Sequence, residues 1–132
     1  MKPKKSILIV DDEPDAIEFV KAVLSDIGEF HIISAKDGKE GINKAVTDKP
    51  DLIILDVIMP GMDGFLVFHE LRNSKETKDI PVIMLTGVAD KVGIKFMKED
   101  MKNYTGAEPI EYIEKPLDPA NLEQVVRKAL KM

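Results

Sequence analysis

Short runs of hydrophobic residues alternate along this chain with longer segments in which hydrophobic residues recur every three or four positions. A short apolar run bounded by turn residues is typical of a strand that is buried on both faces of a sheet. A strict alternation of apolar and polar residues is typical of a half-buried strand. These patterns predict five strands, over residues 6–10, 30–34, 52–55, 81–86 and 110–114.

The segments between the strands carry helix signals. Pro14 suits the first turn of a helix, and Gly28 supplies its end. Asp37 and Asp118 are cap residues, because a short acidic side chain can accept a hydrogen bond from a free backbone N–H group. Five helices are therefore predicted, between Pro14 and Gly28, between Asp37 and Pro50, after Asp63, over residues 89–104, and from Asp118 onward. The third helix is expected to carry its apolar positions at Phe65, Leu66, Leu71 and either Phe68 or His69.

Strand and helix alternate five times in this prediction. That order favours an α/β fold, a doubly wound parallel sheet with helices on both faces and right-handed connections. In such sheets a ligand binds beyond the carboxyl ends of the strands, where the strand order reverses. The residues at these strand ends share polar side chains, and they are Asp11, Asp12, Asp56, Thr86 and Lys115. Chance explains one such residue more easily than five, so we expect a site at this edge.

Composition narrows the class of protein. With 132 residues, 44% of them hydrophobic and 33% charged, residues 1–132 are expected to form one soluble domain with a short basic tail at 1–5. The net charge of −5 argues against a general affinity for nucleic acid or for an anionic membrane surface. The absence of cysteine excludes disulfides, thiolate metal sites and a cysteine nucleophile, and it is compatible with the expected cytoplasmic location. No apolar run approaches the ~20 residues of a membrane span.

The expected site has a defined chemistry. Three carboxylates at close range repel one another and stay ionised only when a cation offsets them. Ligands that are all oxygen atoms select a hard ion, so Mg²⁺ is the expected cofactor. Lys115 and Thr86 suit a tetrahedral anion such as a phosphoryl group, and an Asp carboxylate is a nucleophile in phosphoryl transfer. Asp56 is the better candidate for that nucleophile because it stands alone on the central strand, whereas the adjacent Asp11 and Asp12 suit metal coordination.

Four segments together make the chain similar to the receiver domain of two-component response regulators. These segments are Ile9–Glu13, Leu55–Gly64, Leu85–Gly87 and Tyr112–Pro116. Each segment alone is a weak signal, but the combination is specific and the similarity covers nearly the whole chain. The resemblance implies a flavodoxin-like strand order, 2-1-3-4-5, for the five-stranded sheet.

The resemblance also implies roles for individual residues. Asp56 would accept a phosphoryl group from a histidine kinase or a phosphotransfer protein. Mg²⁺ would be held by Asp12, Asp56 and the backbone carbonyl of Ile58, and Asp11 would assist, often through a water molecule. Lys115 would contact the phosphoryl group.

The same resemblance implies a switch between two conformers. Thr86 would move to hydrogen-bond the phosphoryl group, and the ring of Tyr112 would turn inward behind it. The peptide bond before Pro116 would be cis. Phosphorylation would then shift an equilibrium that already exists, so the expected protein is a signalling switch rather than a turnover enzyme.

Two features depart from the family pattern. The stretch from Thr86 to Lys115 is longer than usual, and the extra length falls in the predicted helix 89–104 and the loop 105–109. That helix is rich in apolar residues, so part of it, with the last strand and helix, is expected to bind a downstream protein. Ile58 stands where many relatives carry a polar residue, and we expect it to hinder an attacking water. A dephosphorylation rate no lower than that of Ile58→Asn would contradict this expectation.

Three alternatives remain open. The chain is expected to act as a stand-alone module, although a receiver domain excised from a larger response regulator or hybrid kinase has the same features. Small hydrolases also use an Asp nucleophile, but Asp56 lacks the second acid that such enzymes place close beside it. A receiver-like scaffold that never takes phosphate is disfavoured by the complete set of acids. We expect protein partners rather than nucleic acid or membrane, and either a monomer or a dimer promoted by phosphorylation.

Overall fold

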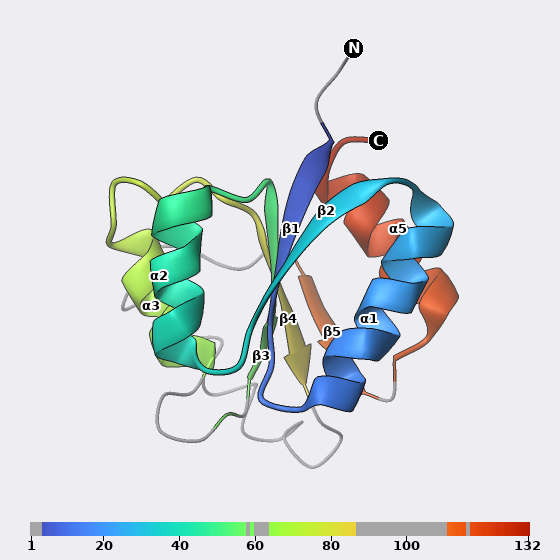
Figure 1. The fold of residues 1–132 in the computed structure, drawn as a ribbon, viewed down its shortest axis with the longest axis horizontal. Helices are drawn as coiled ribbons and strands as arrows, with labels where there is room; N and C mark the ends of the chain where they lie inside the picture. The colour runs from blue at the N-terminus through green and yellow to red at the C-terminus, as the bar shows by residue number, and fades with distance from the viewer. Residues whose placement is uncertain (1–3, 58, 60–63, 87–110, 116) are drawn as a thin grey trace.

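The computed structural model describes residues 4–57, 59, 64–86, 111–115 and 117–132 (Figure 1). Five strands lie in this part of the chain: β1 (Lys5–Val10), β2 (Phe30–Ala35), β3 (Leu52–Asp56), β4 (Val82–Thr86) and β5 (Glu111–Glu114). The helices in the same part are α1 (Pro14–Ile27), α2 (Gly38–Asp48), α3 (Gly64–Arg72) and α5 (Pro119–Ala129). The predicted helix 89–104 and the loop 105–109 lie outside the described residues.

The strands form one parallel sheet in the order β2-β1-β3-β4-β5, which confirms the predicted fold class and strand order. Helices α1 and α5 cover one face of the sheet, and α2 and α3 cover the other (Figure 1). The register aligns the strand ends, since Val10 at the end of β1 pairs with Leu55 on β3, and Asp56 pairs with Leu85 on β4. The residues that follow β1 and end β3 therefore lie at the same edge.

Strand β3 is buried on both faces, as its run of apolar residues predicted. Leu52 and Ile54 pack into the cluster that lies with α1 and α5, whereas Ile53 and Leu55 pack into the cluster of α2 and α3. All four residues have no exposed area. Burying one such side chain stabilises the fold by roughly 1.5–3 kcal/mol, so β3 is a firm support for the carboxylate of Asp56 at its end.

The helix boundaries follow the predicted cap residues. A side-chain oxygen of Asp37 accepts a hydrogen bond from the N–H of Glu40 at 2.8 Å, and Asp118 accepts one from the N–H of Ala120 at 3.1 Å. Each cap of this kind is worth about 1 kcal/mol. Helix α1 ends at Ile27, directly before the predicted stop. Within the described part of the chain, no helix is both long and apolar enough to cross a bilayer.

The predicted core face of α3 was wrong at one position. Leu66 is 44% exposed, whereas its neighbour Val67 is completely buried. A helix brings residues three and four positions apart onto one face, so Leu66 shares its face with the exposed Glu70 and Asn73. The other predicted positions are correct, and the buried residues are Phe65, Phe68 and Leu71.

Candidate functional site

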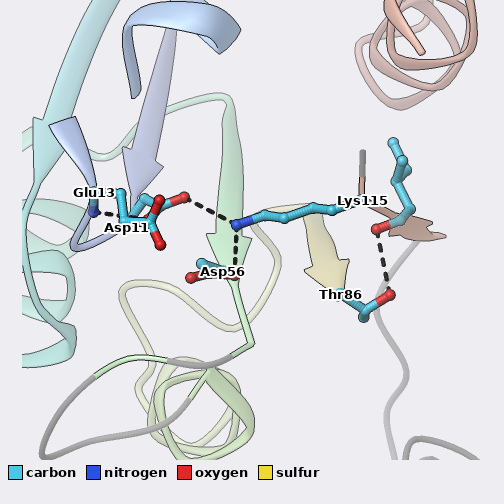
Figure 2. A network of polar contacts seen from close by, with 6 residues as sticks. Asp11, Glu13, Asp56, Thr86 and Lys115 are labelled. Carbon is cyan, nitrogen blue, oxygen red and sulfur yellow. Dashed lines mark hydrogen bonds and ion pairs between the residues drawn. The ribbon is translucent and has the colours of Figure 1, made fainter. Parts of the chain in front are cut away.

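Three charged side chains meet at the carboxyl edge of the sheet (Figure 2). Asp11 directly follows β1, Asp56 is the last residue of β3, and Lys115 directly follows β5. The backbone ladder extends to two of them. The N–H of Asp11 donates to the carbonyl of Ala35 at 3.0 Å, and the N–H of Lys115 donates to the carbonyl of Thr86 at 2.6 Å. The sheet thereby fixes the backbone from which each side chain starts.

Lys115 bridges the two buried carboxylates, as Figure 2 shows. Its Nζ lies 3.2 Å from Oδ1 of Asp56 and 3.5 Å from Oδ2 of Asp11. Asp11 is 1% exposed and Asp56 is 6% exposed, whereas Asp12 is exposed to solvent. Removing one partner of a buried ion pair leaves an uncompensated charge, so Lys115 matters more here than a lysine in a surface pair would.

Asp11 is oriented by the start of α1. Its Oδ1 accepts a hydrogen bond from the backbone N–H of Glu13 at 3.0 Å. Glu13 is the N-cap residue of α1, and Pro14 after it favours an extended backbone at Glu13 (φ −100°, ψ 116°). Sequence reasoning missed this role of the Glu13 backbone. The signal that could have revealed it is the proline, which fixes where the helix begins.

Burial and charge act on the ionisation of the site. Burial, and then the charge of Asp11, raises the pKa of Asp56 from the ordinary 3.8 to about 6, although Lys115 opposes this shift. Burial lowers the pKa of Lys115, but the charges and hydrogen bonds of Asp56 and Asp11 outweigh it, so this pKa lies above its usual value. Lys115 therefore stays protonated at neutral pH, and Asp56 loses its proton near pH 6.

The donor set fits a hard divalent cation. Asp11, Asp12 and Asp56 each offer a carboxylate oxygen, and these atoms lie within 4.8 Å of one another. Oδ2 of Asp11 is buried, and its partner among the described residues is the ammonium of Lys115 at 3.5 Å. Because Lys115 shares its charge between Asp11 and Asp56, a divalent cation would complete the compensation of this oxygen. Three carboxylates face one ammonium, so two positive charges would balance the site. Oxygen ligands alone favour Mg²⁺ or a similar ion.

Thr86 lies at the same edge but its hydroxyl serves another contact. The hydroxyl of this buried residue donates to the carbonyl of Ile113 on β5 at 3.4 Å, and Figure 2 shows it on the side away from Asp56. Tyr112, two residues before Glu114 on β5, pairs with Met84 and is half-buried. In this conformation Lys115 contacts the buried acids, and the Thr86 hydroxyl is bonded to the carbonyl of Ile113 on β5.

Some of the predicted site residues are not covered. Ile58 and Pro116 lie outside the described residues. The carbonyl ligand at Ile58 and the cis peptide before Pro116 therefore stay predictions. The same holds for the partner-binding surface expected on helix 89–104.

Comparisons with known proteins agree with this geometry. The family model of the response regulator receiver domain matches residues 7–127. The chain is 36% identical over 135 aligned positions to the probable transcriptional regulator ycf27 of Guillardia theta. That alignment covers 99% of this chain but 47% of the relative. The chain spans about half the length of the curated relatives it matches.

Solved structures show the same fold. The chemotaxis protein CheY4 of Vibrio cholerae superimposes with a TM-score of 0.81 at 29% identity, over 97% of this chain and 100% of that one. The receiver domain of the sensor histidine kinase PA1611 from Pseudomonas aeruginosa PAO1 gives a TM-score of 0.79 at 25% identity, over 98% and 100% of the two chains. That structure is described as having a magnesium ion coordinated in its active site cleft.

Proposed function

This chain belongs to the response regulator receiver domain family, and from that premise we propose that it is a phosphorylation-dependent signalling switch. Asp56 takes the phosphoryl group, and its donor is a histidine kinase or a phosphotransfer protein. The observation that carries this proposal is the position of the Asp56 carboxylate, buried at the end of β3 and 3.2 Å from the ammonium of Lys115. No other carboxylate among the described residues combines these features with a place on the central strand.

The proposed step is a simple displacement. A carboxylate oxygen of Asp56 attacks the phosphorus of a phosphohistidine, the P–N bond breaks, and its electron pair returns to the imidazole nitrogen. With a pKa of about 6, the Asp56 carboxyl is ionised at neutral pH and can attack. The protonated Lys115 faces the phosphoryl oxygens and stabilises their charge.

Asp11, Asp12 and Asp56 would hold the Mg²⁺ ion, together with the carbonyl of Ile58. Such an ion neutralises charge on the transferring group. The buried Asp11 Oδ2, whose ammonium partner Lys115 lies 3.5 Å away and is shared with Asp56, supports this assignment. So does the similarity to the PA1611 receiver domain, whose structure is described with magnesium in its cleft.

Thr86 and Tyr112 carry the proposed signal. The Thr86 hydroxyl breaks its hydrogen bond to the Ile113 carbonyl and instead donates to a phosphoryl oxygen on Asp56. The ring of Tyr112 then turns inward behind Thr86. The backbone N–H of Lys115, the residue after β5, donates to the Thr86 carbonyl, so a displacement of Thr86 also displaces the end of β5. The surface of β5 and α5, with the partner-binding surface expected on residues 89–104, is proposed to change its affinity for a downstream protein or for a second copy of the chain.

The test is a comparison of labelling with turnover. With acetyl phosphate and Mg²⁺, the switch incorporates at most one phosphoryl group per chain, and Asp56→Asn incorporates none. Steady hydrolysis of a phosphate ester such as p-nitrophenyl phosphate, dependent on Asp56, would favour the hydrolase instead. Neither of the two residues after Asp56, Val57 and Ile58, is the second acid that such enzymes carry near the nucleophile, which supports the switch.

The extent of the protein and its location remain part of the proposal. We expected a stand-alone, cytoplasmic module of one domain without a nucleic-acid partner. The relatives are named as transcriptional regulators, and this chain spans about half of their length, so the absence of a nucleic-acid partner is not supported for such longer proteins. The receiver itself is proposed to act through protein contacts. The intact mass of the protein from its own cells tests the stand-alone arrangement.

A further inference from the structure

Gly64, the first residue of α3, lies against the backbone that carries Asp56. We propose that Gly64 is a positioning residue, whose missing side chain lets α3 seat directly on the end of β3 and so sets the place of the Asp56 carboxylate. This inference rests on the proposed function, because its effect is read out as phosphorylation and Mg²⁺ binding at Asp56.

The contact is unusually close. A Cβ atom built on Gly64 would collide with the backbone carbonyl oxygen of Asp56 and would lie 2.8 Å from the Cα of Val57 and 3.1 Å from the carbonyl carbon of Asp56. The N–H of Gly64 donates to the carbonyl of Val57 at 2.7 Å. Helix α3 is therefore joined to the two residues at the end of β3 by contact and by a hydrogen bond.

Space, rather than backbone conformation, requires glycine here. The φ angle of Gly64 lies outside the left-handed range, so an L-residue would meet no strain from its own backbone. Gly41 differs in kind, because the three atoms nearest to an added Cβ there all belong to the side chain of Val10 and none is a backbone atom. At Gly64 the obstructing atoms are backbone atoms of β3, and they move only if the strand end or the helix moves.

The strand end is the part that would yield. Helix α3 is anchored beneath Gly64 by the buried side chains of Phe65, Val67 and Phe68. Among the described residues, the peptide after Asp56 is bonded to β4 through the N–H of Val57, which donates to the carbonyl of Leu85 at 2.9 Å. A Cβ at position 64 pushes on this peptide. The Asp56 carboxylate then shifts relative to its partners, and misplacing a reacting group by about 1 Å can cost a hundredfold in rate.

The experiment compares Gly64→Ala with Val67→Ala. Val67 lies on the same helix and is fully buried, so its truncation destabilises the fold without adding an atom near Asp56. For each folded variant, the Mg²⁺ dissociation constant is measured by isothermal titration calorimetry. The maximal rate of labelling by acetyl phosphate at saturating Mg²⁺ is measured by mass spectrometry.

The expected result separates position from stability. Gly64→Ala weakens Mg²⁺ binding and lowers the maximal labelling rate by about tenfold or more. Val67→Ala also loses stability, but its Mg²⁺ dissociation constant and its maximal labelling rate stay within about twofold of the wild-type values. Equal labelling rates and Mg²⁺ affinities for Gly64→Ala and the wild type would overturn the inference. Failure of the wild type to take phosphate would instead overturn the proposed function, and the Mg²⁺ comparison would still test Gly64.

A second measurement needs no substitution and covers the case in which Gly64→Ala does not fold. The scalar coupling across the hydrogen bond from the Gly64 N–H to the Val57 carbonyl is recorded by NMR in the wild type, with and without Mg²⁺. A coupling that is present in both states supports the seating of α3 on β3. Its absence, together with fast exchange of the Gly64 amide, would contradict it.

Discussion

Replacing Asp56 by Asn should stabilise the protein in the absence of metal. The pKa of Asp56 is raised to about 6 by burial and by the charge of Asp11. A raised pKa means that the folded state holds the proton more tightly than the unfolded state does. Stability is then complete below about pH 4, falls as the pH rises, and reaches its lower level above about pH 6. Asn stays neutral and escapes this loss.

The size of the effect follows from the shift. One pKa unit corresponds to about 1.4 kcal/mol, so the ionised Asp56 costs at most about 3 kcal/mol. Solvent near the partly exposed Lys115 screens the charges, and Asn also loses the ion pair with this lysine. We therefore expect Asp56→Asn to be about 1–2 kcal/mol more stable than the wild type at pH 7.5.

Urea unfolding in EDTA at pH 4 and pH 7.5 measures this difference. The gain of Asp56→Asn should be near zero at pH 4 and present at pH 7.5, while Asp26→Asn at an exposed position of α1 should show no such gain. Mg²⁺ should raise the stability of the wild type more than that of Asp56→Asn, because the variant lacks one of the three carboxylates that would hold the ion. A variant that is less stable than the wild type at pH 7.5 without metal would refute the reasoning.

Three further substitutions test the other groups of the site. Lys115→Met leaves Asp11 and Asp56 without their cation, so the pKa of Asp56 measured by ¹³C NMR should rise further and labelling by acetyl phosphate should slow by about tenfold or more. Unchanged values of both would contradict the role of Lys115. Asp12→Asn should weaken Mg²⁺ binding in calorimetry but leave the stability in EDTA within about 0.5 kcal/mol, because Asp12 is exposed. Thr86→Val removes the hydrogen bond to Ile113 and should cost about 1 kcal/mol in urea unfolding. Its phosphorylated form should show smaller NMR shifts along β5 than the wild type does, and equal shifts would exclude Thr86 from the switch.

The sheet and the acidic cluster could be predicted because both depend on local patterns. Leu52 to Leu55 form an unbroken apolar run, and such a run has one stable place in a parallel sheet, buried on both faces. Once β1 and β3 are parallel neighbours, the acids that follow them must meet. The rule about strand ends therefore located Asp11 and Asp56 without any coordinates.

The remaining features depend on contacts that no local pattern encodes. In α3 the residues from Phe65 to Phe68 are all apolar, so their periodicity could not decide between Leu66 and Val67 for the core. The need for glycine at position 64 arises from the backbone of β3, several residues away. The direction of the Thr86 hydroxyl depends on a carbonyl of β5 that is distant in sequence.

The central claim is that Asp56 is the phosphoryl acceptor. The most direct measurement incubates the protein with acetyl phosphate and Mg²⁺, reduces the acyl phosphate with borohydride, and maps the reduced residue by peptide mass spectrometry. The account predicts that Asp56 alone is converted to homoserine, and that the conversion requires both the phosphodonor and Mg²⁺. Conversion at another carboxylate, or no conversion in a folded protein that binds Mg²⁺, would contradict it.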